Sequence, residues 1–192
     1  MEALLVPAAA VALAEIGDKT QLLAFLLAAR FRSPLPILAG MAVATLANHG
    51  IAGALGGWIA ATVDAQVLRW ILGGGFLAMA VWMLVPDKAD DAELGVASGL
   101  GVFTATLIAF FLAEMGDKTQ IATVALAMHY DSAVAVVVGT TLGLMAVNAP
   151  AVFLGDRFAQ RIPMRLVHIA AAVLFALFGI AALSGAGGSL WQ

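Results

Sequence analysis

The residues with the most evident chemistry lie in two nearly identical polar runs inside long apolar stretches. The first run is Ala-Glu-Ile-Gly-Asp-Lys-Thr-Gln at 14–21, and the second is Ala-Glu-Met-Gly-Asp-Lys-Thr-Gln at 113–120. Each run supplies two carboxylates, and carboxylate oxygens are the ligands that hard divalent cations prefer. We therefore predict a cation site built from the four carboxylates of the two runs, which are Glu15, Asp18, Glu114 and Asp117.

Neighbouring side chains are expected to support this site. Hydroxyl and amide groups can add neutral oxygens, and these belong to Thr20, Gln21, Thr119 and Gln120. On a continuous helix, Lys19 and Lys118 each follow a glutamate at the i, i+4 spacing of an intrahelical ion pair. Four carboxylates and two ammonium groups leave a net charge of −2, which one divalent cation or two protons would neutralise. This balance favours exchange of a metal ion against protons.

A purely structural role for the charged residues is the alternative. Glu–Lys pairs can hold helices together inside a membrane, but such pairs leave Asp18 and Asp117 without a role. Gly17 and Gly116 lack side chains, so each permits either the close approach of another helix or local unwinding of its own helix.

The composition indicates that the chain resides in a membrane. Of its 192 residues, 63% are hydrophobic and 11% are charged, and the mean hydropathy is +1.03. Soluble domains carry about 25% charged residues. The net charge of −3 provides no basic surface for nucleic acid, and the absence of cysteine excludes disulfides and thiolate metal ligands. Soluble enzymes, disordered chains and nucleic-acid-binding proteins are therefore excluded.

Six apolar stretches reach the roughly 20 residues that a membrane span needs. They are expected at about 3–29, 35–60, 67–85, 98–128, 132–155 and 164–184. The chain begins without a basic segment, so no cleaved signal peptide is expected. Basic residues concentrate in the loops after the first, third and fifth spans, namely Arg30, Arg32, Lys88, Arg157, Arg161 and Arg165. The positive-inside rule therefore predicts cytoplasmic positions for these loops and outer positions for both termini.

The sequence repeats itself at an offset of 99 residues. Ala10–Leu84 aligns without a gap onto Ala109–Leu183, and the polar runs coincide. Each copy holds three spans, an odd number, so the copies are expected to cross the membrane in opposite directions. We predict an all-α integral membrane protein with six transmembrane helices in two inverted three-helix repeats, residues 1–93 and 94–192. Such repeats place the substrate site of many secondary transporters at their interface.

Three further polar residues lie within the second and fifth spans, and these are Asn48, His49 and Asn148. His49 and Asn148 are equivalent across the repeat, because 49 plus 99 is 148. Such residues can line a transport pathway, and they can equally hydrogen-bond a neighbouring helix and do nothing more. Gly40 and Gly139 are expected to serve close helix packing.

The motif Glu-x-Gly-Asp-(Lys/Arg)-(Ser/Thr), present twice, resembles the signature of the GDT family of small cation/proton exchangers. Glu15–Thr20 and Glu114–Thr119 match it in full, and the resemblance covers nearly the whole chain. Bacterial members of that family include manganese exporters, and eukaryotic members handle manganese and calcium in the Golgi and chloroplast. The resemblance implies that the four carboxylates bind the cation and that transport is proton-coupled export from the cytosol. It also implies a bacterial inner-membrane protein that is no enzyme and needs no cofactor.

Manganese is the expected substrate, with calcium as the alternative. All-oxygen ligands suit both ions, and a nitrogen from His49 would favour manganese. An intramembrane aspartyl protease needs two aspartates that share a proton and has no use for the additional glutamates and lysines. An exporter of amino acids or small metabolites fits a symmetric, net anionic site poorly, and lysines in the pathway disfavour a passive channel. The expected partners are a divalent metal ion, protons and the lipid bilayer, and the sequence leaves homo-oligomerisation open.

Overall fold

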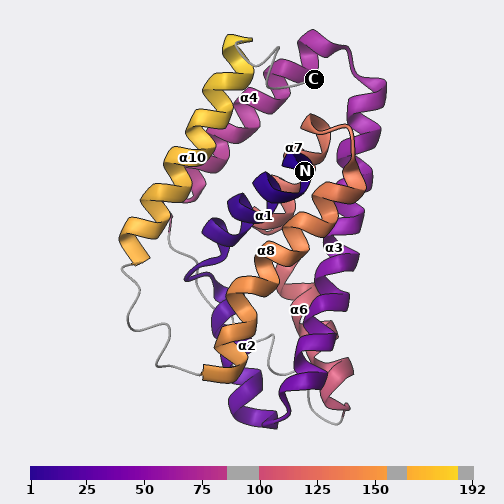
Figure 1. Ribbon diagram of the computed structural model, residues 1–192, viewed down its shortest axis with the longest axis vertical. Coiled ribbons are helices and arrows are strands. Elements are labelled where there is room, and N and C mark those ends of the chain that lie inside the picture. The colour runs from indigo at the N-terminus through magenta and orange to yellow at the C-terminus, as the bar shows by residue number, and fades with distance from the viewer. Residues whose placement is uncertain (86–99, 155–163, 186–192) are drawn as a thin grey trace.

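The computed structural model describes residues 1–85, 100–154 and 164–185, and it folds them into helices without any strand (Figure 1). The helices in chain order are α1 (Glu2–Glu15), α2 (Lys19–Phe31), α3 (Pro34–Thr62), α4 (Ala65–Trp82), α6 (Val102–Glu114), α7 (Lys118–His129), α8 (Ala133–Leu154) and α10 (Met164–Ser184). Four of them, α3, α4, α8 and α10, are long and apolar enough to cross a membrane.

Two of the six expected spans differ from the prediction. The stretches 3–29 and 98–128 each form two helices, α1 with α2 and α6 with α7, which are separated at the polar run. A single continuous helix through each run is therefore wrong. The other four spans agree with the observed helices to within three residues, because their length and uniform apolar character are sufficient to define them.

The helix boundaries repeat at the same offset as the sequence. Helices α2 and α7 begin at residues 19 and 118, α3 and α8 at 34 and 133, and α4 and α10 at 65 and 164. Each of these pairs is separated by 99 residues. The interruption within each polar run therefore recurs at the same place in both copies.

Each interrupted segment packs on the long helix of the other copy. Helix α1 packs along α8, and α6 packs along α3. Glycines allow the close approach: a Cβ added to Gly139 would collide with the Leu4 carbonyl of α1, and one added to Gly40 would lie 2.7 Å from the Phe103 carbonyl of α6. The expected packing role of Gly40 and Gly139 is confirmed, and the two copies are interlocked.

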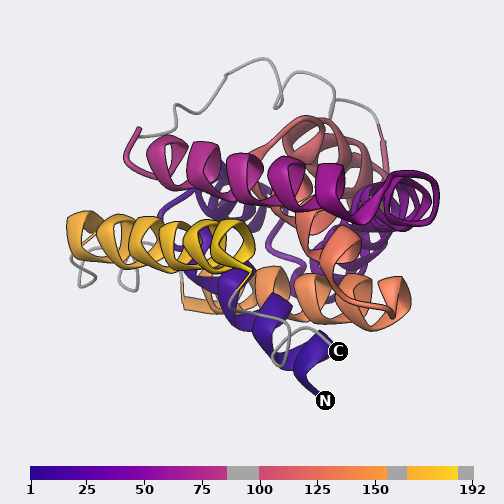
Figure 2. The ribbon, with the colours of Figure 1, turned by 90° about the horizontal axis from the view of Figure 1, so that it is seen from above.

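The buried apolar residues form two clusters that divide the interrupted segments. One cluster joins α1, α7 and Val136 of α8 to the pair α4 and α10, which lie side by side in Figures 1 and 2. The other joins α2 and α6 to α3 and α8. The two halves of each interrupted segment therefore belong to different clusters, and the polar runs lie at the boundary between them.

The outer surface carries many large apolar side chains. Trp58, Leu35, Val134 and Leu166 are all more than 60% exposed. Water would make such a surface unfavourable, whereas lipid tails match it. This surface is consistent with helices embedded in a bilayer.

Candidate cation site

Each polar run forms a tight turn between two helices. In the first run, Ile16 has φ −64° and ψ 115°, Gly17 has φ 83°, and the Asp18 N–H donates to the Glu15 carbonyl at 3.1 Å. These are the features of a type II β-turn, whose third residue needs a positive φ and is therefore glycine. Gly17 thus unwinds the helix, the second of its two expected effects.

The second run repeats this turn closely. Met115 has φ −68° and ψ 117°, Gly116 has φ 77°, and the Asp117 N–H donates to the Glu114 carbonyl at 3.2 Å. In both runs the motif's glycine is therefore required by the backbone conformation.

The glutamines stabilise the turns. The Gln21 Oε1 accepts from the Gly17 N–H at 3.1 Å, and the Gln120 Oε1 accepts from the Gly116 N–H at 2.7 Å. Each bond satisfies a glycine N–H that has lost its helical hydrogen-bond partner at the turn. The glutamine oxygens that were expected to add to the cation site are thus committed to the backbone in this structure.

The threonines hold the glutamates. The Thr20 hydroxyl donates to Glu15 Oε1, and the Thr119 hydroxyl donates to Glu114 Oε2 at 2.8 Å. Both glutamates are fully buried. A hydrogen bond to a buried carboxylate contributes more than a neutral one, about 1.5–3 kcal/mol. Each glutamate is therefore held in place by a hydroxyl from the first turn of the following helix.

The aspartates begin the second helix of each pair. Asp18 and Asp117 are the residues immediately before α2 and α7, and both have extended backbone angles. Neither carboxylate caps the helix that follows it. They are 5% and 4% exposed, and a negative charge at a helix N-terminus is stabilised by the helix dipole. The turns thus present buried carboxylates whose oxygens are not used for capping.

The two runs meet in space. The Lys19 Nζ lies 3.6 Å from Asp117 Oδ1 of the other copy. Helix α1 also contacts α7, and α2 contacts α6. The two polar runs, one from each copy, are therefore neighbours in the structure.

The expected i, i+4 geometry of the lysines is wrong, because the turn separates each lysine from its glutamate. Lys19 instead forms the inter-copy ion pair with Asp117 and is 21% exposed. Lys118 is 4% exposed and donates to the Val85 carbonyl, just beyond α4, at 3.0 Å. The same interruption places Glu15 at the end of α1 and Asp18 just before α2, so these two carboxylates are not on one continuous helix.

The polar residues of the long helices reach the same region. The Asn148 Nδ2 donates to Glu15 Oε1 at 2.8 Å. The Asn48 Nδ2 donates to the Phe111 carbonyl at 2.9 Å, and its Oδ1 accepts from Gln120 Nε2 at 3.4 Å. Both asparagines therefore contact the motif-bearing segments of the other copy.

His49 differs from the asparagines. It is fully buried, and neither ring nitrogen has a hydrogen-bond partner within the described part of the chain. Sequence reasoning did not single out three further buried hydroxyls that are also without partners there, those of Thr45, Thr106 and Thr141. The signal available for them was a polar residue in an otherwise apolar span.

The carboxylates do not form a closed metal site in this conformation. Among the described residues, no three His, Asp or Glu side chains gather closely enough to hold a metal ion. The arrangement is therefore two neighbouring groups of buried carboxylates, one per turn, which we call the Glu15 half-site (Glu15 and Asp18) and the Glu114 half-site (Glu114 and Asp117).

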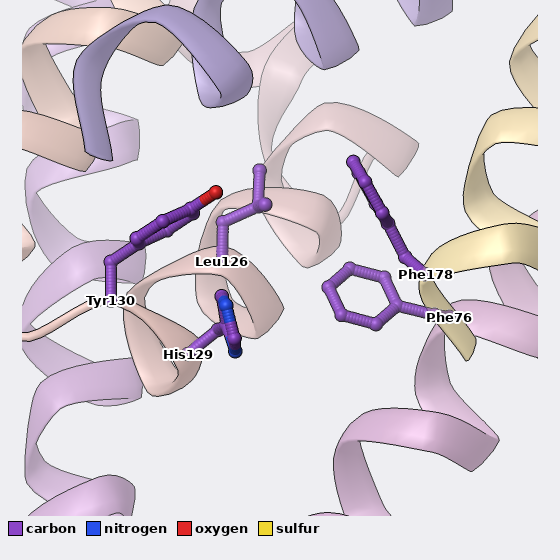
Figure 3. A pocket seen from close by; sticks show the side chains of 5 residues that line it. All are labelled: Phe76, Leu126, His129, Tyr130 and Phe178. Atoms are coloured by element: carbon purple, nitrogen blue, oxygen red, sulfur yellow. The ribbon is translucent and has the colours of Figure 1, made fainter. Parts of the chain in front are cut away.

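A small hollow lies apart from the half-sites, at the end of α7 (Figure 3). Its lining consists of Phe76, Leu126, His129, Tyr130 and Phe178, with no motif residue among them. Burial, with the nearby charge of Glu2, raises the pKa of the Tyr130 hydroxyl. The hollow belongs to the packing of α7 against α4 and α10.

Comparison with known proteins identifies relatives along nearly the whole chain. Residues 3–91 and 102–189 match the family model described as "Divalent cation/proton antiporter GDT1". A Vibrio cholerae protein named "Putative manganese exporter" is 48% identical over 182 residues, which cover 94% of this chain and 90% of that protein. The GDT1-like protein sll0615 of Synechocystis is 30% identical over 190 residues, covering 88% of this chain and 91% of that protein.

More distant relatives occur in plants. GDT1-like protein 3 of Oryza sativa is 29% identical over 203 residues, covering 93% of this chain and 72% of that protein. No solved structure matches the chain. With its apolar spans, its two turn-forming motifs and these relatives, the chain belongs to the GDT1 family of divalent cation/proton antiporters.

Proposed function

We propose that this protein exports a divalent cation, Mn²⁺ first and Ca²⁺ as the alternative, from the cytosol in exchange for protons. The observation that carries the proposal is that two neighbouring turns, joined by the Lys19–Asp117 ion pair, bury the side chains of Glu15, Asp18, Glu114 and Asp117 in an apolar bundle. Isolated charges at that depth cost about 2.5–3.5 kcal/mol each, so a substrate that neutralises them explains their presence.

Charge balance supports exchange rather than simple binding. The four carboxylates with Lys19 and Lys118 carry a net charge of −2 when ionised. One divalent cation neutralises this charge, and so do two protons. A site that is stable only when it holds either the cation or the protons couples cation movement in one direction to proton movement in the other. The Vibrio relative's name supports manganese as the cation.

The two turns support alternating access. Each turn joins two helices that belong to different apolar clusters, with α1 and α7 in one cluster and α2 and α6 in the other. Helix α8 contributes to both clusters, and α1 packs along α8 as α7 packs along α3, so the proposed change of access is a bend at the turns, where the half-sites lie. Movement of two bodies about a central site is how inverted-repeat transporters expose it to each side in turn.

Purified protein in liposomes tests the exchange. We expect Mn²⁺ uptake that accelerates when the vesicle interior is acidic, together with proton efflux recorded by a pH-sensitive dye. Glu15→Gln combined with Glu114→Gln serves as the inactive control. Mn²⁺ and Ca²⁺ fluxes that ignore the proton gradient, or the absence of both fluxes, would overturn the proposal.

We further propose a bacterial inner-membrane location, six spans, inverted repeats and both termini on the outer side. The basic loops support this orientation. Ser33 and Ser132 are equivalent residues in the loops before α3 and α8, and the chain has no cysteine, so a single cysteine at either position reports its side. We expect an impermeant maleimide to label Ser132→Cys in intact cells and Ser33→Cys only after permeabilisation. Labelling of both in intact cells would exclude inversion.

A further inference from the structure

The surroundings of the two motif glutamates differ at a pair of equivalent positions on the long helices α8 and α3. In the Glu15 half-site, the Asn148 amide of α8 donates to Glu15 Oε1 at 2.8 Å. An offset of 99 relates Glu15 to Glu114 and Asn148 to His49. Beside the Glu114 half-site, the residue equivalent to Asn148 is therefore His49, which carries an imidazole instead of an amide.

The packing places α3 beside the second turn as α8 lies beside the first. Helix α3 packs on both α6 and α7, just as α8 packs on α1 and α2. Asn48, next to His49, bonds the Phe111 carbonyl three residues before Glu114, and it accepts from Gln120 after the turn. These bonds fix the register of α3 along the turn that carries Glu114.

Both groups of this pair have unused polar atoms. His49 is 0% exposed and its Nδ1 and Nε2 have no hydrogen-bond partner in the described regions; Glu114 is 0% exposed and its Oε1 has none there either. A buried polar atom without a partner costs about 1–3 kcal/mol. His49 and Glu114 are the equivalents of Asn148 and Glu15, which bond each other directly, so a shared ligand would satisfy the atoms that this pair leaves unpartnered.

We propose that His49 and Glu114 are ligands of the transported cation, with one imidazole nitrogen and Glu114 Oε1 as donors, and that His49 determines which cation is carried. This inference rests on the proposed function. Ca²⁺ takes oxygen ligands, whereas first-row transition metals also accept imidazole. His49 therefore discriminates in favour of Mn²⁺ over Ca²⁺.

The test is His49→Asn, which gives the Glu114 half-site the amide that the Glu15 half-site already has. In liposomes we expect the ratio of Mn²⁺ to Ca²⁺ transport efficiency to fall about tenfold or more, with Ca²⁺ transport retained. Adding Asn148→His, which moves the imidazole to the Glu15 half-site, is expected to restore part of the preference. His129→Asn, at the hollow apart from the motifs, is the matched control and should leave the ratio unchanged.

A spectroscopic measurement keeps the inference testable if the variant is inactive. Electron spin echo spectra of Mn²⁺ bound to the purified wild type should show modulation from an imidazole ¹⁴N, and His49→Asn should lack it. An unchanged transport ratio, or ¹⁴N modulation that persists in His49→Asn, would overturn the role of His49. Absence of transport of either cation by the wild type would instead refute the proposed function.

Discussion

The Glu15 and Glu114 half-sites share a backbone but differ in what surrounds their carboxylates. Both have a type II turn, a threonine that donates to the glutamate and a glutamine that accepts from the glycine N–H. Around Glu15, Asn148 adds a second donor, whereas the equivalent His49 forms no such bond. The turns and their threonine and glutamine bonds, which both half-sites share, therefore position the carboxylates. We expect the selectivity among cations to depend on the position where Asn148 and His49 differ.

The largest expected effect tests whether both half-sites are needed. Glu15→Gln and Glu114→Gln should each reduce Mn²⁺ transport at least about a hundredfold, since loss of even an outer-shell partner costs 10–100-fold. Proteoliposome flux measures it, with Glu2→Gln at the exposed start of α1 as the control. Near-normal flux in either single variant would show that one half-site works alone.

The threonines sharpen the comparison. Thr119 gives Glu114 its one hydroxyl bond, whereas Glu15 receives both Thr20 and Asn148. Thr119→Val should weaken apparent Mn²⁺ affinity about tenfold, because a hydrogen bond to a charged group contributes about 1.5–3 kcal/mol. Thr20→Val should have a smaller effect because Asn148 remains. Titrations of transport against Mn²⁺ concentration measure both, and a larger effect for Thr20→Val would reverse the proposed difference.

The glycines test whether the two turns are equivalent in stability. Gly116 has open space around it, so the cost of Gly116→Ala comes from its positive φ alone, about 1–2 kcal/mol. Gly17→Ala should cost a similar amount. Gly75→Ala is the control, because Gly75 is helical with open space and alanine should stabilise it by about 0.5–1 kcal/mol. Thermal unfolding in detergent measures all three, and no loss in Gly116→Ala would contradict a required turn.

The smallest expected effect concerns the lysines. The Lys19–Asp117 pair is partly exposed, so Lys19→Met should change the activation free energy of transport by about 1 kcal/mol or less. High salt, which screens the pair, should have the same effect on the wild type. Lys118, at the start of α7, is nearly buried and donates to the Val85 carbonyl beyond α4, so the effect of Lys118→Met should be independent of salt. Flux measured at low and high ionic strength distinguishes them. Equal salt responses would remove this difference between the half-sites.

Much of the fold could be predicted from the sequence, because long apolar stretches and a repeat of 99 residues define helices without knowledge of their contacts. The turn at each motif could not be selected in the same way. Gly17 permits a close helix approach as readily as unwinding, and the choice depends on Gln21 bonding the freed N–H. The helical spacing of Lys19 was misleading for this reason.

The residues proposed for the site come from the sequence, whereas the contacts between them could not be predicted from it. The four carboxylates follow from two motifs in apolar surroundings. The Lys19–Asp117 and Asn148–Glu15 pairs join residues 98 and 133 positions apart, and only the packing of one copy on the other brings them together. Thr45 and Thr106 were overlooked because single hydroxyls in apolar spans carry little information by themselves.

The interlocking of the copies has a consequence for biosynthesis. Glu15 is translated early, yet the amide of Asn148 that bonds it and the helix α8 that covers α1 emerge more than a hundred residues later. Until then, the segment that forms α1 to α4 lacks the donor from Asn148 and the packing surface of α8. A ribosome-released fragment ending before α8 should be unable to complete its own packing, and quality-control proteases are its expected fate.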